Sequence, residues 1–348
     1  METNRGADTY QEILSQGETW AKTLAAAGRQ TAPILEWLRK PRSDTYFIGC
    51  GSTYYLSQAA AFHWRVATGG RAIALPSSEL WLNPSAYLPG ESSLLVCVSR
   101  SAETSETVHA LETYQKMERG DSLVVTCYGD RQLAQMADQK LVAQDAQERS
   151  VAQTRSFTSM FLLTQAAAGV AAEDRDYLSD LEAVPAAFGP LIENYESLAR
   201  QLAEDARLER FIFLGSGLTY GLANEAMLKM KEMSLSPSEA FHFLEFRHGP
   251  KSVVDEQTLI VGLLNEHALQ QEAAVLSEMQ ELGATILAIS EDETGLDFEH
   301  LVELRSGVGE LARGVLTLPI LQLLAYYRSM HKGLNPDQPK NLDAVVKL

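Results

Sequence analysis

Hydroxyl-bearing side chains are concentrated in residues 97–107, CVSRSAETSET, directly after the apolar run of residues 94–98. Ser99, Ser101 and Thr104 lie where a helix is expected to begin. Their hydroxyls and the free backbone N–H groups of the first helical turn can converge on one anion, and the helix dipole favours negative charge at that end. The stretch therefore predicts a phosphate site that needs no basic surface.

A helix cap is the alternative explanation of these hydroxyls. Ser101 or a neighbour would cap the helix, with Glu103 and Glu106 completing a capping box. One cap uses one hydroxyl, so a cap alone does not explain the whole cluster.

Glycines precede a second expected helix in the loop Gly49-Cys50-Gly51-Ser52-Thr53, which also follows an apolar run. Glycine lets the backbone approach a ligand closely, but a single G-x-G is as common in turns that bind nothing. The third glycine of the G-x-G-x-x-G pattern is missing, so a Rossmann dinucleotide enzyme is disfavoured.

Acid and base groups gather in the stretch that begins EAMLKMKEMS at Glu225 and ends FRHGPKSV. Lys229 and Glu232 are three residues apart and share one helix face, and His248 precedes the stiff Gly-Pro turn. A carboxylate, a lysine and a histidine suit transfer of a carbon-bound proton. A solvated ion pair and a structural histidine are the alternatives, and closeness to the phosphate site would decide between the two explanations.

The composition restricts the partners of the protein. The 348 residues carry a formal net charge of -17, which disfavours nucleic acid and anionic membranes as main partners. Cys50, Cys97 and Cys127 show no C-x-x-C spacing, so we expect neither disulfides nor a metal site, and a cytoplasmic location. The start of the sequence shows no signal peptide, and the apolar stretch of residues 316–327 is too short to span a bilayer.

The sequence repeats itself at an offset of about 166 residues. FIGCGSTYYLSQAAAFHW, residues 47–64, aligns with FLGSGLTYGLANEAMLKM, residues 213–230, and the following apolar runs align at nearly the same offset. Leu264 stands opposite Ser99, so the second copy keeps the strand but not the hydroxyls. We therefore expect one copy to bind phosphate and the other to have diverged.

Short β-branched runs alternate with longer amphipathic segments in both copies, which predicts an α/β fold with two doubly wound parallel sheets. Helices are expected in residues 9–40 and 312–333, and residues 171–205 are expected to be helical with breaks at Pro185 and Gly189-Pro190. The expected strands cover residues 45–49, 72–75, 93–98 and 122–127 in the first copy and 210–214, 258–264 and 284–289 in the second.

Seven motifs resemble, in sequence order, the sugar isomerase (SIS) domain family. They are FIGCGSTYY, VSRSAETSET, SVAQTRSFTSM, EAMLKMKEMS, SEAFHFLEFRHGP, LPILQLLAYY and PDQPKNL. The tandem form that they resemble is found in the isomerase half of glucosamine-6-phosphate synthase and in AgaS-type amino-sugar-phosphate isomerases and deaminases. The resemblance covers nearly the whole chain.

The resemblance implies two SIS domains, each a doubly wound parallel sheet in an αβα sandwich. We expect N-terminal helices in residues 1–40, a phosphate-binding SIS domain in 41–175, a second SIS domain in 176–333, and a tail in 334–348 that closes the active site.

Site residues follow from the same resemblance. Glu232 would move a proton between C1 and C2 of a sugar through an enediol or enolamine, with Lys229 close by. His248 would open the sugar ring and reach into the site of the neighbouring subunit, which implies a homodimer. The residues expected to bind or adjoin the 6-phosphate are Ser52, Thr53, Ser99, Arg100, Ser101, Thr104 and Val151.

Three departures from the family pattern matter. Arg100 and Ala102 replace Gln and Gly of the usual S-Q-S-G-E-T loop, and Arg100 either adds charge to the phosphate site or points away from it. Ala344 stands where the synthase tail has its Schiff-base lysine, leaving Lys340 and Lys347 as displaced candidates. The glutamine-hydrolysing domain of the synthase is not seen ahead of the SIS region, so no glutaminase activity is expected.

The expected function is therefore an isomerase or deaminase acting on a hexose or hexosamine 6-phosphate, without a cofactor. The alternative is a non-catalytic sensor of sugar phosphates, because SIS domains also serve as ligand-binding modules in regulators. Retention of Glu232 and His248 favours the enzyme.

Overall fold

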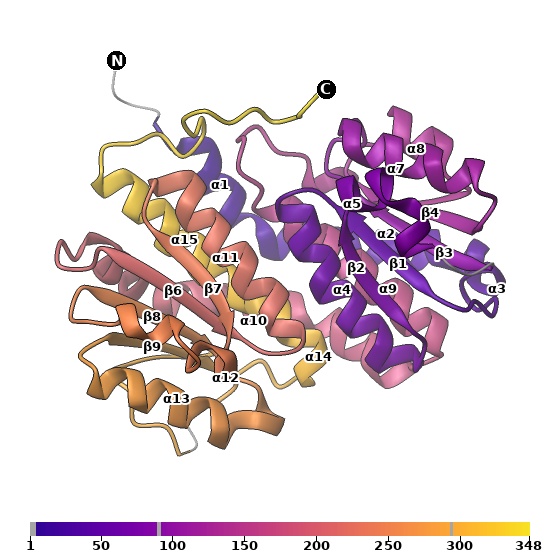
Figure 1. The fold of residues 1–348 in the computed structure, drawn as a ribbon. Helices are drawn as coiled ribbons and strands as arrows, with labels where there is room; N and C mark the ends of the chain where they lie inside the picture. The colour runs from indigo at the N-terminus through magenta and orange to yellow at the C-terminus, as the bar shows by residue number, and fades with distance from the viewer. Residues whose placement is uncertain (1–4, 89–91, 293–294) are drawn as a thin grey trace. The chain divides into compact units, whose positions relative to one another are not determined.

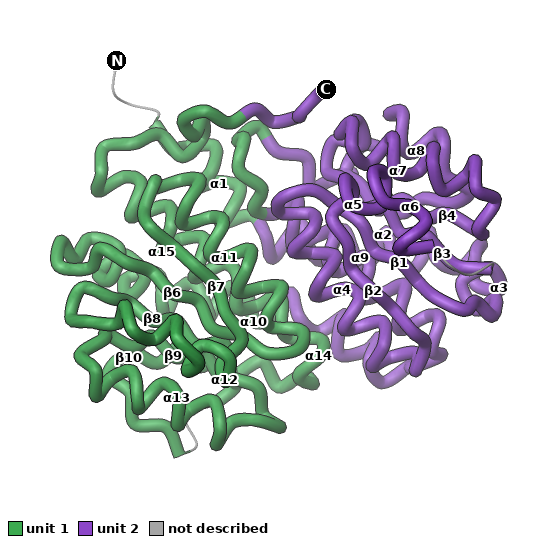
Figure 2. The backbone as a smooth tube through the Cα atoms, viewed as in Figure 1, with its two compact units in different colours: residues 1–15, 149–154, 186–342 green, residues 16–148, 155–185, 343–348 purple. Residues whose placement is uncertain are grey.

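The computed structural model describes residues 5–88, 92–292 and 295–348, so the first four residues of the expected N-terminal helical region lie outside it. The chain forms two compact units (Figure 2). Unit 1 comprises residues 1–15, 149–154 and 186–342, and unit 2 comprises residues 16–148, 155–185 and 343–348.

Unit 2 is built on a parallel five-stranded sheet with the order β2-β1-β3-β4-β5. Every residue of β1 and β3 is buried, because helices cover both faces of the sheet. The strands are β1 (Thr45–Gly49), β2 (Ala72–Pro76), β3 (Ser93–Val98), β4 (Gly120–Thr126) and β5 (Gln139–Val142).

Side chains of unit 2 alternate between the two sheet faces. Ile48 packs in one core cluster with residues of α5, α7 and α8, whereas the neighbouring Phe47 packs edge-on against Trp64 of α4 on the other face. Figure 1 shows the helices of this unit around the sheet. The helices are α2 (Gln16–Thr31), α3 (Leu35–Leu38), α4 (Ser52–Thr68), α5 (Ser77–Leu82), α6 (Pro84–Tyr87), α7 (Ser105–Lys116), α8 (Gln132–Met136) and α9 (Arg155–Ala172), with 3-10 turns η1 (Ala32–Ile34) and η2 (Gln144–Ala146).

Unit 1 repeats this design with a parallel sheet of order β10-β9-β8-β6-β7. One face packs against α12 and α13, and α11 packs with α15 on the other. The strands are β6 (Arg210–Gly215), β7 (Ser238–His242), β8 (Thr258–Leu263), β9 (Thr285–Ser290) and β10 (His300–Glu303). The helices are α1 (Ala7–Leu14), α11 (Leu218–Ser234), α12 (Phe243–Phe246), α13 (Leu269–Glu281), α14 (Glu310–Arg313) and α15 (Thr317–His331), with 3-10 turns η3 (Pro250–Val253), η4 (Glu266–Ala268) and η5 (Gly314–Leu316).

The two copies share one turn geometry at the end of their first strand. Gly51 and Gly217 have nearly the same backbone, with φ of 55° and 58° and ψ of -125° and -121°. A Cβ on Gly49 would lie 2.4 Å from the backbone of Thr53, and a Cβ on Gly215 would lie 2.4 Å from that of Thr219. The expected α/β fold with two parallel sheets is confirmed, and the repeated glycines are explained by close packing of strand against helix.

Two expectations about elements are wrong. Residues 175–204 form one uninterrupted helix, α10 (Arg175–Glu204), across Pro185 and Gly189-Pro190. The helix continues because its buried apolar side chains, Leu181, Val184, Phe188 and Leu191, keep helical spacing through the breaks. The second error is the omission of β5, β7 and β10, which are all edge strands.

Candidate active site

The hydroxyl-rich loop of unit 2 connects β3 to α7 and lies at the carboxyl end of the sheet, where open α/β sheets bind ligands. Ser99 and Ser101 are both buried. The Oγ of Ser99 accepts the N–H of Ala102 at 3.1 Å, and the Oγ of Ser101 accepts the N–H of Glu103 at 3.2 Å. These bonds fold the loop into a tight concave turn ahead of the helix.

The helix-cap alternative, in which Ser101 or a neighbour caps α7 through its side chain, is not seen in the structure. Thr104 is the N-cap residue of α7, but its side chain makes no capping hydrogen bond. Its Oγ1 lies 3.4 Å from the Oγ of Ser99 instead. The loop also places Ala102 at a φ of 54°, a left-handed conformation that costs about 1–2 kcal/mol for a residue with a Cβ. This explains why the resembling family has glycine there.

The glycine loop Gly49–Thr53 lies beside this loop, because β1 and β3 are adjacent parallel strands. The hydroxyl of Thr53 donates to the carbonyl of Cys50 at 2.9 Å and accepts the N–H of Cys50 at 2.9 Å. Thr219 makes the same two bonds with Ser216 in unit 1, so this hydroxyl shapes the turn in both copies. Ser52, at the start of α4, is buried.

Arg100 directs its guanidinium toward two partners outside the loop. Nη1 lies 3.3 Å from Oε2 of Glu148, and Nη2 donates to the carbonyl of Ala344 at 3.1 Å. The Glu148 side chain is fully buried and also accepts the N–H of Ser156 at 3.0 Å. Val151 belongs to unit 1, where its N–H donates to the carbonyl of Asp337 at 3.1 Å.

The acid and base groups of unit 1 form a buried charged group on α11. The Nζ of Lys229 lies 3.3 Å from Glu225 and 2.5 Å from Glu232, and its side chain is 1% exposed. Burial alone would lower the pKa of Lys229, but the two carboxylates raise it above the ordinary value. Lys229 is therefore a fixed cation, and the solvated ion pair is excluded.

Glu232 is the accessible end of this charged group. Its side chain is 19% exposed, whereas that of Glu225 is fully buried. A carboxylate that is partly exposed and held in one place by an ion pair can be reached by a substrate proton. His248 lies on an exposed turn between α12 and η3, and the next residue, Gly249, has a φ of 112°.

The second copy fills the corresponding place with its own carboxylate. After β8, the Glu272 side chain accepts the N–H of Asn265 at 2.8 Å and its Nδ2 at 3.0 Å. Burial raises the pKa of Glu272, and the bonds from Asn265 oppose that rise. An internal carboxylate thus takes donors that an external anion would use, which gives a physical account of the divergence.

Sequence reasoning missed Glu148, Glu225 and Glu272, each of which binds a residue that it had singled out or aligned. The spacing E-x-x-x-K-x-x-E in residues 225–232 puts both carboxylates on the lysine's side of the helix and was a usable signal. Glu148 carries no comparable local pattern, because the tertiary fold brings it to Arg100, 48 residues away. Glu272 is seven residues from Asn265, but this spacing is not a recognised motif.

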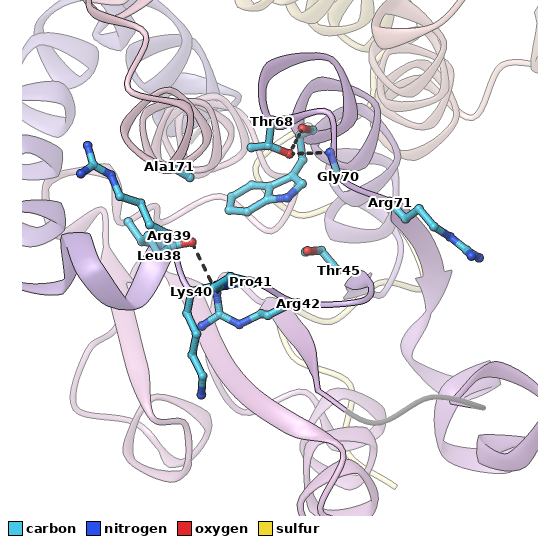
Figure 3. Close-up of a pocket in the computed structure, with 11 residues that line it drawn as sticks. Leu38, Arg39, Lys40, Pro41, Arg42, Thr45, Thr68, Gly70, Arg71 and Ala171 are labelled. Atoms are coloured by element: carbon cyan, nitrogen blue, oxygen red, sulfur yellow. Dashed lines mark hydrogen bonds between the residues drawn. The ribbon is translucent and has the colours of Figure 1, made fainter.

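A pocket of about 210 Å³ lies at the opposite, amino-terminal edge of the unit 2 sheet (Figure 3). Figure 3 shows the side chains of Arg39, Lys40 and Arg71 pointing away from its interior. Acidic partners also hold its cations, as when Asp121 pairs with both Lys40 and Arg42. We therefore place the candidate site at the carboxyl edge. The pocket is lined by Leu38, Arg39, Lys40, Pro41, Arg42, Thr45, Trp64, Thr68, Gly70, Arg71 and Ala171.

Two absences concern only the part of the chain that the structure describes. Within residues 5–88, 92–292 and 295–348, no three His, Cys, Asp or Glu side chains are grouped so as to hold a metal ion. No helix among the described residues is long and apolar enough to cross a membrane.

The paired parallel sheets and the repeated glycine turn define a duplicated α/β protein with strand-end loops. A family model described as SIS domain matches residues 38–169 and 206–296, together more than half of the chain. The chain belongs to the SIS domain family, as the resemblance predicted.

Named relatives fall in sugar-phosphate metabolism. The glutamine–fructose-6-phosphate aminotransferase of Pseudomonas putida is 28% identical over 337 residues, which are 93% of this chain and 54% of that protein. The chain thus spans about half the length of the curated relatives it matches.

Two solved structures have the same fold. Glucosamine-6-phosphate deaminase from Thermotoga maritima is 26% identical, with a TM-score of 0.80 over 98% of this chain and 100% of its own. Tagatose-6-phosphate ketose/aldose isomerase from Escherichia coli is 24% identical, with a TM-score of 0.86 over 96% of this chain and 95% of its own.

Proposed function

We propose that the protein is an enzyme that acts on a hexose or hexosamine 6-phosphate, either interconverting aldose and ketose or releasing ammonia. The observation that carries the proposal is the charged group on α11, in which Lys229 is fully buried and Glu232 alone keeps an exposed edge. Membership of the SIS family and the hydroxyl-rich loop after β3 support a phosphorylated sugar as substrate.

In this mechanism the loop of residues 99–105 recognises the 6-phosphate, and Glu232 moves the proton. Glu232 takes the proton from C2 of the open-chain aldose, and the C–H electron pair becomes the C1=C2 bond of an enediol as the C1 oxygen gains a proton. Return of a proton to C1, while the hydroxyl on C2 loses its proton and its O–H electron pair forms the C2=O bond, gives the ketose. Lys229 holds the carboxylate of Glu232 in place through their ion pair, in which Nζ and Oε2 are 2.5 Å apart.

An amino sugar follows the same path with a different end. The enolamine becomes a ketimine at C2, and water adds to it, so the oxygen comes from water and the nitrogen leaves as ammonia. This branch needs no lysine imine, and it is compatible with Ala344 at the position of the synthase lysine. Lys340 and Lys347 remain the displaced candidates for imine chemistry.

Assembly and location are part of the proposal. The exposed position of His248 supports its contribution to a neighbouring subunit's site, where it would open the sugar ring in a homodimer. The free thiols of Cys50, Cys97 and Cys127 support a cytoplasmic location. We assign no glutamine hydrolysis to the described residues.

Coupled assays of ammonia release and of aldose–ketose exchange test the function. The substrates are the 6-phosphates of glucosamine, galactosamine, fructosamine, glucose and fructose. Ammonia from one of them establishes a deaminase, and exchange without ammonia establishes an isomerase. If all five are inert and none raises the melting temperature, the proposal is wrong.

Glu232→Gln separates chemistry from binding. We expect it to lower kcat at least about 1000-fold while the dissociation constant changes less than about threefold, because the amide cannot accept the proton. Glu239→Gln, an exposed glutamate on β7, is the control and should keep wild-type turnover. Loss of binding together with turnover would contradict the role of Glu232 as the base.

A non-catalytic sensor of sugar phosphates is the second candidate. Ala344, at the position of a catalytic lysine in the resembling synthase, favours it. A panel that raises the melting temperature but yields no product would establish this candidate.

A further inference from the structure

The segment of residues 343–348 lies along the loop after β3, and both belong to unit 2. The carbonyl of Ala344 accepts a hydrogen bond from Arg100, and the carbonyl of Val346 lies 3.4 Å from the N–H of Ser105. The N–H of Leu348 donates to the Oγ of Ser105 at 3.1 Å. We call residues 343–348 the strap, since they contact the loop at both of its ends.

The guanidinium of Arg100 forms an ion pair with the carboxylate of Glu148. That carboxylate is fully buried, and its other contacts include the N–H of Ser156 at the start of α9. A buried carboxylate without a cation is costly, so removal of Arg100 from this position would destabilise the fold. A guanidinium has further N–H groups in a fixed fork, and one of them reaches the carbonyl of Ala344.

The contact at Ser105 is of a different kind. Its N–H belongs to the first turn of α7, one of the groups without an intrahelical acceptor that an anion would use. The bond to Val346 is long at 3.4 Å and therefore weak. An anion bound at the loop competes with Val346 for this N–H but leaves the Arg100 contact to Ala344 intact.

We propose that Arg100 is a positioning residue that anchors the strap over the phosphate loop through Glu148, and that it does not bind the phosphate itself. Arg100 fixes the strap at Ala344, whereas its outer end contacts Ser105 through Val346 and Leu348 and Glu103 through Lys347. Anion binding at the N–H of Ser105 competes with the Val346 contact alone. This inference uses one part of the proposed function, namely that the loop after β3 binds an anion.

The first test measures motion of the strap by ¹⁵N relaxation of the backbone amides of residues 344–348. Arg100→Lys keeps the charge that Glu148 needs but has no fork to reach both partners. We expect order parameters near 0.8 in the wild type and below about 0.6 in this variant. Arg71→Lys is the control, because Arg71 pairs with Asp44 at 3.2 Å at the amino-terminal edge of the same sheet, the edge opposite the strap. Equal order parameters in all three proteins would overturn the anchoring role.

The second test measures the affinity of inorganic phosphate by calorimetry. Arg100→Gln with Glu148→Gln removes both charges of this pair together, so neither is left without the other. A positioning residue predicts a dissociation constant within about threefold of wild type, whereas loss of a charge-assisted bond to phosphate weakens binding by about tenfold or more. A tenfold loss overturns the proposal.

These readouts separate the proposal from the function. Strap motion is measured without substrate, so it stands even if no sugar phosphate is turned over. If phosphate does not bind the wild type, the loop is not an anion site, which contradicts the proposed function and the competition at Ser105 but leaves the first test of Arg100 decisive for anchoring.

Discussion

Lys229 is a buried charged residue of unit 1, and its ion pairs with Glu225 and Glu232 compensate the cost of burying its charge. Removal of one partner from a buried ion pair leaves the other charge uncompensated, and the usual cost is about 3–5 kcal/mol. We expect Lys229→Met to lower the free energy of unfolding by about that amount, measured by urea denaturation at pH 7.

Lys231→Met provides the matched control, because Lys231 is an exposed lysine on the same helix. It should change the free energy of unfolding by less than about 0.5 kcal/mol. Equal losses in the two variants would show that helix α11, and not the buried charge, is the cause.

His63 links the stability of unit 2 to pH. Its side chain is 1% exposed, neither ring nitrogen has a hydrogen-bond partner, and its ring lies 4.9 Å from that of Tyr177. Burial lowers the pKa of His63 to about 4. In the unfolded chain His63 takes up a proton near pH 6.5. The contribution of neutral His63 to the free energy of unfolding is therefore fully present above pH 6.5 and is lost as the pH falls toward 4.

We expect His63 to contribute roughly 2–4 kcal/mol to the fall in unfolding free energy between pH 7 and pH 4. Urea denaturation of the wild type and of His63→Phe across this range measures it, and the variant should show the smaller fall. The exposed His331 is the control position, and His331→Gln should retain the wild-type slope. An unchanged slope in His63→Phe would contradict the assignment.

The sequence predicted which residues lie in the candidate site, but it did not predict their hydrogen-bond partners. Ser99 and Ser101 stand out because they follow a strand directly, and the strand-end position does place them in the loop. Arg100 binds Glu148 and Ala344, which are 48 and 244 residues away in the sequence. Asn265 binds Glu272, seven residues away, and no known motif marks either set of partners. The sequence indicates which residues are polar and clustered, but not which donors are already taken.

At the level of elements, α10 and α9 contain glycines in opposite surroundings. A Cβ on Gly189 of α10 would meet nothing within 4 Å, whereas a Cβ on Gly169 of α9 would lie 2.9 Å from side chains of Tyr177 and Leu178. Alanine is favoured over glycine inside a helix by about 1 kcal/mol, and overpacking costs about 1–3 kcal/mol. We expect Gly189→Ala to stabilise the protein by about 1 kcal/mol and Gly169→Ala to destabilise it by about 1 kcal/mol.

Thermal and urea unfolding of these two variants test the continuity of α10 through its prolines. If Gly189→Ala is destabilising, residue 189 is not helical and the break expected from the sequence would be restored. The pair controls itself, since both changes add one methyl group to a helical glycine.

The central strands could be predicted, as could the edge strand β2, whose sequence AIALP is mostly apolar, whereas the edge strands β5, β7 and β10 could not. β1 and β3 are buried on every residue and therefore read as continuous apolar runs. The short edge strands β5, β7 and β10 mix exposed or half-exposed positions with buried ones, and their sequences QKLV, SEAFH and HLVE carry no run or alternation.

For the molecule as a whole, the strand-end loops of the two copies differ in the groups they present. In unit 2 the loop after β3 carries the hydroxyls of Ser99, Ser101 and Thr104. In unit 1 the carboxylate of Glu272 accepts the backbone and side-chain N–H groups of Asn265. An anion that bound in unit 1 would have to displace the carboxylate of Glu272, which belongs to the chain itself and is 2% exposed. The sequence predicted this asymmetry from the absence of hydroxyls, and Glu272 supplies its cause.

We therefore expect one phosphate-bearing ligand per chain, although the chain holds two copies of the fold. Calorimetry with a hexose 6-phosphate measures the stoichiometry directly. Ser101→Ala should weaken binding by about tenfold, because it removes a hydroxyl from a charged ligand's loop, and Ser216→Ala in the loop of the second copy should leave the affinity unchanged. Two ligands per chain, or equal losses in the two variants, would mean that the tethered carboxylate does not close the second site and that both copies have kept the ancestral capacity to bind an anion.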